Sequence, residues 1–335
     1  MISLLIIGNG FDKKCELKSS FDDFEDSQYW VKDSQHLFWF FIFSYRKQIF
    51  PNENDNDWKW CSVEDLIGWV IHNYNELPTD ISDVFEKIWR DPNISRSERL
   101  FLELGKFEKR FRQYLTNEVN ESDKQERHLT NRYSYKVSKL LEEIKNQAFI
   151  TGGLHIINFN YTEILPIVKA DGYLGLQGIT NADGLYCWEK IVENNVHGTL
   201  KTEIIIGIDD KNCRDKKDGN DDFKFSKTYR KMELQGRTDF QGKKQNLPDD
   251  VDQIIFFGHS LGKQDYSYFH SLFDYYKLYD SKIRLKFCFS KGHELTNEIY
   301  WLLHEYGEEF SNQRQGHNLL HKILLEGRLQ IIKLK

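Results

Sequence analysis

The sequence lacks the patterns that mark exported, membrane-spanning or metal-binding proteins. Its five cysteines are odd in number, widely scattered and form no C-x-x-C pair, which predicts reduced thiols in a cytoplasmic protein. The apolar runs near the N-terminus and over 37–43 are far shorter than the roughly 20 residues that cross a bilayer, and we see no export signal. No His-Glu-x-x-His motif or paired Cys/His spacing is present, so we expect no metal.

A basic excess is also missing. The net charge of −6 argues against a general nucleic-acid-binding protein, because neutralising phosphates requires cations. No internal repeat or low-complexity tract is evident. The 335 residues contain 8 Trp, 17 Tyr and 24 Phe, enough apolar area for one large domain or two ordinary ones, so wholesale disorder is excluded.

The N-terminal segment carries the first positive signal. The apolar residues Leu4–Ile7 run directly into Gly8-Asn9-Gly10, and a buried strand followed by Gly-x-Gly is a common phosphate-binding arrangement in α/β proteins. Lys13 stands where the dinucleotide fingerprint has its third glycine, so the pattern alone fits a plain strand-turn-helix as well as a nucleotide site.

Further apolar segments predict the rest of an α/β, Rossmann-like, mostly parallel sheet. Buried strands are expected over 154–159, 203–209 and 254–257, with an alternating edge strand over 283–289. We assign residues 1–26 and 149–290 to this core, with 209–249 as a long loop or cover. Apolar residues at helical spacing between them predict a helical insertion over 27–148, and 291–335 a C-terminal helix and final segment.

Polar residues follow several of these strands. Because ligands bind beyond the carboxyl ends of parallel strands, these residues should converge even when they are far apart in the sequence. The candidates for a nucleotide-binding site are Gly8, Asn9, Gly10, Phe11, Asp12, Asn160, Thr162, His197, Gly258, Ser260 and Asp265. Each also has a structural explanation: an asparagine or aspartate can cap a turn or helix, and a lone histidine is often structural.

The order of these motifs resembles a known family. Ile6-Ile7-Gly8-Asn9-Gly10-Phe11-Asp12, Asn158-Phe159-Asn160-Tyr161-Thr162, Val196-His197-Gly198-Thr199 and Phe257-Gly258-His259-Ser260-Leu261-Gly262 occur in the order found in the AbiH family of bacteriophage abortive-infection proteins. Glu64 and Phe225-Ser226-Lys227-Thr228-Tyr229 extend the resemblance. The resemblance implies a role in phage defence.

The same order is similar, more distantly, to the sirtuin-like NAD-binding fold of defence NADases. Gly8 and Gly10 match its phosphate turn, Asn160 its Thr-x-Asn-x-Asp asparagine, and His197 its His-Gly histidine. Gly258 and Ser260 match its late Gly-x-Ser turn, whereas Asn9 and Thr162 depart from it. The resemblance implies NAD as substrate or ligand, with Asn160 and His197 catalytic.

The chemistry of NAD hydrolysis suits these residue types. An enzyme that breaks the nicotinamide–ribose bond must hold the ribose, stabilise an oxocarbenium-like carbon and position water. An asparagine amide can bond ribose hydroxyls and water, and a histidine accepts a proton near neutral pH. Asp12 would bond a ribose hydroxyl or supply negative charge near the cation.

Two other function classes stay open. Gly258-His259-Ser260-Leu261-Gly262 is a G-x-S-x-G pattern after a strand, as in serine esterases, with Asp280 and His293, His304 or His317 as later triad partners. Alternatively, the chain is a non-catalytic nucleotide sensor whose insertion binds a phage-derived trigger, a defence partner or another copy, with the aromatic run Phe38–Phe43 as contact or core. Lys224, Lys227, Arg230 and Lys231 form a basic cluster that we interpret as a solvated face.

Overall fold

The computed structural model describes residues 2–30, 37–49, 60–77, 79–88, 93–124, 129–171, 191–213, 221–236, 247–290, 295–309 and 313–334. The chain forms two compact units. The first comprises residues 1–17, 119–199 and 243–335, and the second comprises residues 18–118 and 200–242. Each unit is therefore built from segments that are distant in the sequence.

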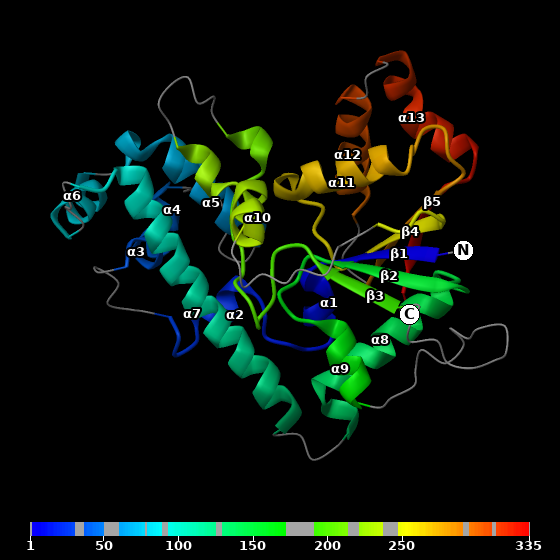
Figure 1. The fold of residues 1–335 in the computed structure, drawn as a ribbon, viewed down its shortest axis with the longest axis horizontal. Helices are drawn as coiled ribbons and strands as arrows, with labels where there is room; N and C mark the ends of the chain where they lie inside the picture. Colours follow the sequence, from blue (N-terminus) through cyan, green and yellow to red (C-terminus); the bar gives the residue numbers. More distant parts are fainter. Residues whose placement is uncertain are drawn as a thin grey trace. The chain divides into compact units, whose positions relative to one another are not determined.

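A six-stranded, all-parallel sheet forms the centre of the first unit (Figure 1), with strand order β3-β2-β1-β4-β5-β6. The strands are β1 (Ile2–Ile7), β2 (Gly153–Asn158), β3 (Ile191–Asn195), β4 (Val251–Phe257), β5 (Arg284–Phe289) and β6 (Leu329–Lys333). This is the strand order of doubly wound nucleotide-binding sheets, with its switch point between β1 and β4. The predicted α/β, Rossmann-like fold is confirmed.

Helices cover both faces of this sheet (Figure 1). One face packs on α1 (Asn9–Lys14), α8 (Tyr133–Gln147) and α9 (Ile164–Asp171), and the other on α11 (Tyr266–Tyr275), α12 (Thr296–Glu309) and α13 (Gln313–Leu325). Successive residues of β1 alternate between the two cores, yet Leu4–Ile7 are all fully buried. This two-sided burial explains why central strands are continuous apolar runs, each side chain contributing about 1.5–3 kcal/mol.

The second unit is helical in the residues described. Its helices are α2 (Phe21–Glu25), α3 (Phe38–Ser44), α4 (Arg46–Ile49), α5 (Trp60–His72), α6 (Thr79–Ile88), α10 (Lys227–Gly236) and most of α7 (Arg96–Lys124). Short 3₁₀ turns lie at Tyr74–Glu76, Asp210–Asn212 and Asp222–Phe225 in this unit, and at Leu129–Asn131 and Lys263–Asp265 in the first. No strand occurs between β1 and β2 in the part of the chain that the structure covers.

Aromatic rings fill the interior of the second unit. Phe24 contacts Phe40, Phe107 and Phe111 at centroid distances of 5.1–6.1 Å. The indole N–H of Trp39 donates to the Leu100 carbonyl oxygen at 3.0 Å, so the polar atom of this buried side chain is satisfied. Within the run 38–43 every residue except the partly buried Phe41 is buried, which fits its interpretation as core.

Two strand predictions differ from the structure. The segment 203–209 is not a strand of the sheet: it lies in the second unit, where only Ile208 forms an isolated bridge, to Ser226. β5 is not at an edge, because it lies between β4 and β6. Its polar–apolar alternation includes Lys286, which is buried and donates from Nζ to the Ala148 carbonyl oxygen at 2.6 Å.

Residues 209–249, expected to be a long loop or cover, contain α10 and the 3₁₀ turn before it. The segment over 313–334 supplies both a helix, α13, and the final strand, β6. None of the described helices is long and apolar enough to cross a membrane. Cys15, Cys213 and Cys288 are free thiols, whereas Cys187 and the Cys61 side chain lie outside the described residues.

Candidate functional site at the carboxyl ends of the strands

The turns that follow β1 and β4 pack tightly against each other. The Gly10 N–H donates to the Gly258 carbonyl oxygen at 2.7 Å, and the Gly8 N–H to that of Phe257 at 3.2 Å. A Cβ on Gly10 would lie 2.8 Å from the Gly258 Cα, and one on Gly8 2.7 Å from the His259 Cα. Gly258 itself has φ +67°. Close backbone approach and this left-handed conformation require glycine at all three positions.

This packing changes the meaning of the Gly-x-Gly motif. The N–H groups of Gly8, Gly10 and Phe11 all donate to carbonyl oxygens of the protein. α1 is only six residues long. The amides that would form a phosphate cradle are thus already used, and the motif joins the two central strands at the switch point.

Asp12 lies at the centre of a buried network. Its Oδ1 accepts from the Tyr133 hydroxyl and its Oδ2 from the Thr162 hydroxyl, both at 2.8 Å, and the Asn160 side chain also bonds to it. Asp12 is 2% exposed, and burial raises its pKa to about 6 against the lowering effect of these donors. Three sequence-predicted residues therefore meet here, together with Tyr133, which no sequence pattern indicated.

A second set of polar residues shapes the turn after β2. Asn158 Nδ2 donates to the Thr162 carbonyl oxygen and to Glu193 Oε1, both at 2.7 Å. The two oxygens of Glu193 accept from the N–H groups of Ile164 and Leu165 and so cap α9. Burial raises the pKa of Glu193, and these bonds oppose the increase. These hydrogen bonds from Asn158 and Glu193 fix the conformation of the turn that contains Asn160.

The side chain of Asn160 is oriented by this framework. Its backbone N–H donates to Asn158 Oδ1 at 2.8 Å, and its Nδ2 to the Gly8 carbonyl oxygen at 3.1 Å. Because Nδ2 faces acceptors, the amide nitrogen and oxygen are assigned by the network. Among the described residues no donor is bonded to Oδ1, so this oxygen is able to accept a hydrogen bond.

Two histidines meet one aspartate beside this turn. His197 Nε2 lies 3.3 Å from Asp265 Oδ1, and His259 Nε2 lies 3.4 Å from Asp265 Oδ2. All three are buried, at 4%, 7% and 9% exposure. The Phe159 ring contacts both imidazoles edge-on, at centroid distances of 5.3 and 4.7 Å, and Tyr268 contacts His197 at 5.7 Å. Sequence reasoning selected His197 and Asp265 as site residues and gave His259 no role, although it directly follows Gly258.

The remaining predicted residues lie in different environments. Phe11 is fully buried and packs edge-on against Phe257 at 6.0 Å, so it belongs to the core. Asn9 is partly buried at the start of α1. Ser260 is exposed, and its hydroxyl has no hydrogen-bond partner in the described chain. The positive φ in its turn falls on Gly258 and Leu261 rather than on the serine. Among the described residues no base is bonded to Ser260, so the geometry they show does not support the esterase, and the predicted triad candidate His293 lies outside them.

Two residues of the predicted basic cluster, Lys227 and Arg230, are buried and do not form a solvated face, whereas Lys224 and Lys231 are partly exposed. Lys227 is 2% exposed and its Nζ lies 2.9 Å from both carboxylate oxygens of Glu64, which joins two motifs of the family resemblance. Arg230 forms a two-pronged pair with Glu108, including a 2.6 Å contact between Nη2 and Oε2. These cations are held in the interior of the second unit.

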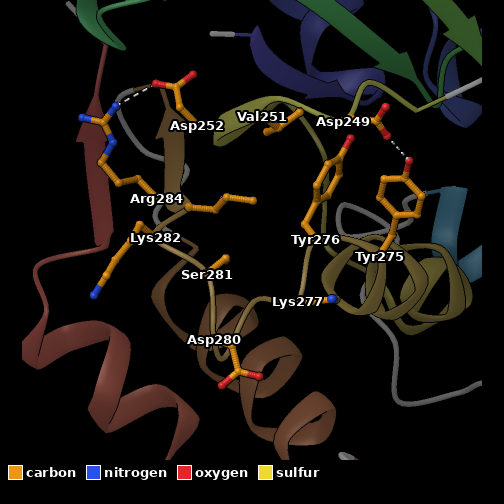
Figure 2. A pocket seen from close by; sticks show the side chains of 11 residues that line it. Asp249, Val251, Asp252, Tyr275, Tyr276, Lys277, Asp280, Ser281, Lys282 and Arg284 are labelled. Atoms are coloured by element: carbon orange, nitrogen blue, oxygen red, sulfur yellow. Dashed lines mark hydrogen bonds and ion pairs between the residues drawn. The ribbon is translucent and has the colours of Figure 1, made fainter.

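A hollow of about 710 Å³ lies elsewhere in the first unit, around the starts of β4 and β5 (Figure 2). Two polar pairs lie in its lining: the Tyr275 hydroxyl donates to Asp249 at 3.0 Å, and Arg284 lies 2.9 Å from Asp252. None of the candidate residues for the nucleotide-binding site lines it. The candidate site is therefore the cluster at the opposite, carboxyl ends of the strands.

Comparison with known proteins finds a family, and its match includes the strand-end cluster. No curated protein and no solved structure matches the sequence. A family model described as bacteriophage abortive infection AbiH matches residues 4–287, which include every residue of the strand-end cluster. Because this match covers far more than half of the sequence, the chain belongs to the AbiH family of bacteriophage abortive-infection proteins.

Proposed function

We propose that this chain acts in abortive infection by binding NAD at the carboxyl edge of its sheet and hydrolysing the nicotinamide–ribose bond. AbiH membership supports the defence role. The observation that carries the chemistry is that the buried Asn160, which bonds to Gly8, and the buried His197–Asp265 pair all follow strands at the carboxyl edge of the same sheet. This is where open parallel sheets bind nucleotides.

In this reaction the bond between ribose C1′ and the nicotinamide nitrogen breaks, and its electron pair neutralises the pyridinium ring. Water adds to C1′ and loses a proton, which gives nicotinamide, ADP-ribose and a proton. Asn160 Oδ1 accepts a hydrogen bond from a ribose hydroxyl or from this water, and His197 accepts the proton. Asp12, which is hydrogen-bonded to the Asn160 side chain, is a buried negative group that stabilises the developing cation.

The close packing of the turns after β1 and β4 restricts where the phosphates of NAD can bind. Because the N–H groups of Gly8, Gly10 and Phe11 donate within the protein, the proposal gives them no phosphate. The ligand approaches instead over partly exposed groups at the same edge, which include Asn9, Gly10, Tyr161, Gly198 and Tyr268. Tyr161 and Tyr268 offer aromatic surface for a base or the nicotinamide ring.

The test follows nicotinamide release from NAD by purified protein and by the His197→Ala and Asn160→Ala variants. We expect each variant to lose about 10²-fold or more in rate, the range of a missing acid–base or positioning group. Lys263→Gln, an exposed change in the 3₁₀ turn before α11, is the matched control and keeps the full rate. Equal rates in all four proteins would refute the roles of His197 and Asn160.

If the protein is inactive until infection triggers it, the assay on purified protein shows no hydrolysis, so a second assay is needed. The same assay is run on protein recovered from phage-infected cells. Saturable NAD binding without nicotinamide release in both preparations would replace hydrolysis by a sensing role. Absence of binding in both would remove NAD from the proposal.

A further inference from the structure

We infer that Asp265 is a positioning residue that fixes the tautomer and orientation of His197, and that His259 holds Asp265 in place for this task. The catalytic meaning of the inference rests on the proposed function. The tautomer argument itself is independent of that function, because it follows from the contacts of the three side chains.

The first link is the state of His259. The Leu261 backbone N–H donates to His259 Nδ1 at 2.9 Å. Nδ1 is therefore an acceptor, and the neutral ring carries its proton on Nε2. That nitrogen faces Asp265 Oδ2 at 3.4 Å. The left-handed conformation of Leu261, with φ +54°, belongs to the same short turn, so the local backbone selects the His259 tautomer.

The second link is the division of the carboxylate. Oδ2 of Asp265 lies 3.4 Å from His259 Nε2, whereas Oδ1 lies 3.3 Å from His197 Nε2, a buried nitrogen for which the structure has no hydrogen bond of good geometry among the described residues. A carboxylate is an acceptor on both oxygens, so both imidazoles can present an N–H to it. Asp265 stands at the N-cap of α11, but its side chain makes no capping hydrogen bond. Its carboxylate is directed to the histidines and not to the helix end.

These links predict what an amide would do at position 265. Asparagine keeps one acceptor, its oxygen, and replaces the other by an N–H donor. His259 cannot change tautomer without losing the bond from Leu261, so it keeps the amide oxygen. The amide N–H then faces His197, whose Nε2 must become the acceptor. Asp265→Asn should therefore reverse the tautomer of His197 and leave that of His259 unchanged, and a reversed tautomer disables a catalytic histidine.

The experiment records imidazole ¹⁵N spectra of the full chain without NAD, for the unmodified protein and for Asp265→Asn. We expect the His197 proton to move from Nε2 to Nδ1 in the variant, with His259 signals unchanged. An unaltered His197 tautomer would overturn the inference. This readout needs no substrate, so it separates failure of the inference from failure of the NAD proposal.

Nicotinamide release is measured on the same proteins. Asp265→Asn should lower kcat by about 10²-fold or more while KM stays near the unmodified value, because the substrate contacts remain. Asp265→Glu restores a carboxylate and should recover both the Nε2–H tautomer and part of the rate. Asp252→Asn makes the same chemical change at the other end of β4, where the carboxylate pairs with Arg284, and is the control. A tautomer that Asp265→Glu fails to restore would also count against the inference.

Discussion

Asp12 in the first unit and Glu108 in the second are both buried carboxylates, but their partners differ. Asp12 is held by neutral donors from Tyr133, Thr162 and Asn160. Glu108 faces the Arg230 guanidinium through both oxygens and also accepts from the Ile206 N–H at 2.7 Å. One charge is solvated by dipoles, and the other is matched by a cation.

The difference in partners indicates a functional role for Asp12 and a structural role for Glu108. Burial raises the pKa of Glu108, and the nearby Arg230 is the largest opposing influence. No cation is among the groups that perturb the pKa of Asp12, which rises to about 6. A buried, unmatched negative charge is costly to keep, so its place next to the strand-end cluster favours a functional role, whereas the Glu108–Arg230 pair holds segments of the second unit together.

Removing the cation of the second unit should have the largest effect. Arg230→Met leaves Glu108 buried without its partner and also removes the contact of the guanidinium with the Phe101 ring. We expect a loss of about 3–5 kcal/mol in the free energy of unfolding. Urea unfolding followed by tryptophan fluorescence measures it, because Trp30, Trp39 and Trp69 belong to the second unit.

The control combines Arg230→Met with Glu108→Gln. The amide removes the orphaned charge and keeps an oxygen for the Ile206 N–H, so most of the stability should return. If the double variant is as unstable as Arg230→Met alone, packing and not charge explains the loss.

Asp12 should make the free energy of unfolding depend on pH. Its pKa is raised from 3.8 to about 6 in the folded protein, so the folded state binds the proton more tightly than the unfolded state. This contribution to stability is fully present below pH 4 and is lost as the pH rises through about 6. The loss amounts to about 3 kcal/mol at most. Asp12→Asn should abolish that part of the slope, measured by urea unfolding from pH 4 to pH 8.

The parallel core was predictable because its strands are buried on both faces. Leu4–Ile7 and 254–257 are apolar without interruption, and such runs ending in polar residues are typical of central parallel strands. The segment 203–209 has the same composition but pairs with no strand of the sheet. Its apolar side chains are buried in the second unit, and composition alone does not say which core a run enters.

Parts of the site were predictable for the same reason and others were not. Asn160, His197 and Asp265 follow predicted elements or motifs, so the parallel topology places them at the same edge of the sheet. Tyr133 lies on α8, within a pattern that only predicts a helix face, and its bond to Asp12 spans 121 residues of sequence. The role of Lys227 was also hidden, because its partner Glu64 is equally remote and burial turns a basic stretch into an interior ion pair.

Tyr133→Phe should give the smallest effect and the sharpest comparison. The Tyr133 hydrogen bond lowers the pKa of Asp12, so its removal raises that pKa and extends the decline of stability above pH 6. The loss near neutral pH should be about 1–2 kcal/mol, as for one bond to a charged group. Tyr114→Phe is the matched control, since its hydroxyl donates to the Lys18 carbonyl oxygen in the second unit and to no carboxylate. It should cost about 1 kcal/mol without altering the pH dependence. If both variants shift the unfolding curves by the same amount at every pH, Tyr133 is an ordinary buried hydroxyl and the distinction between the two carboxylates fails.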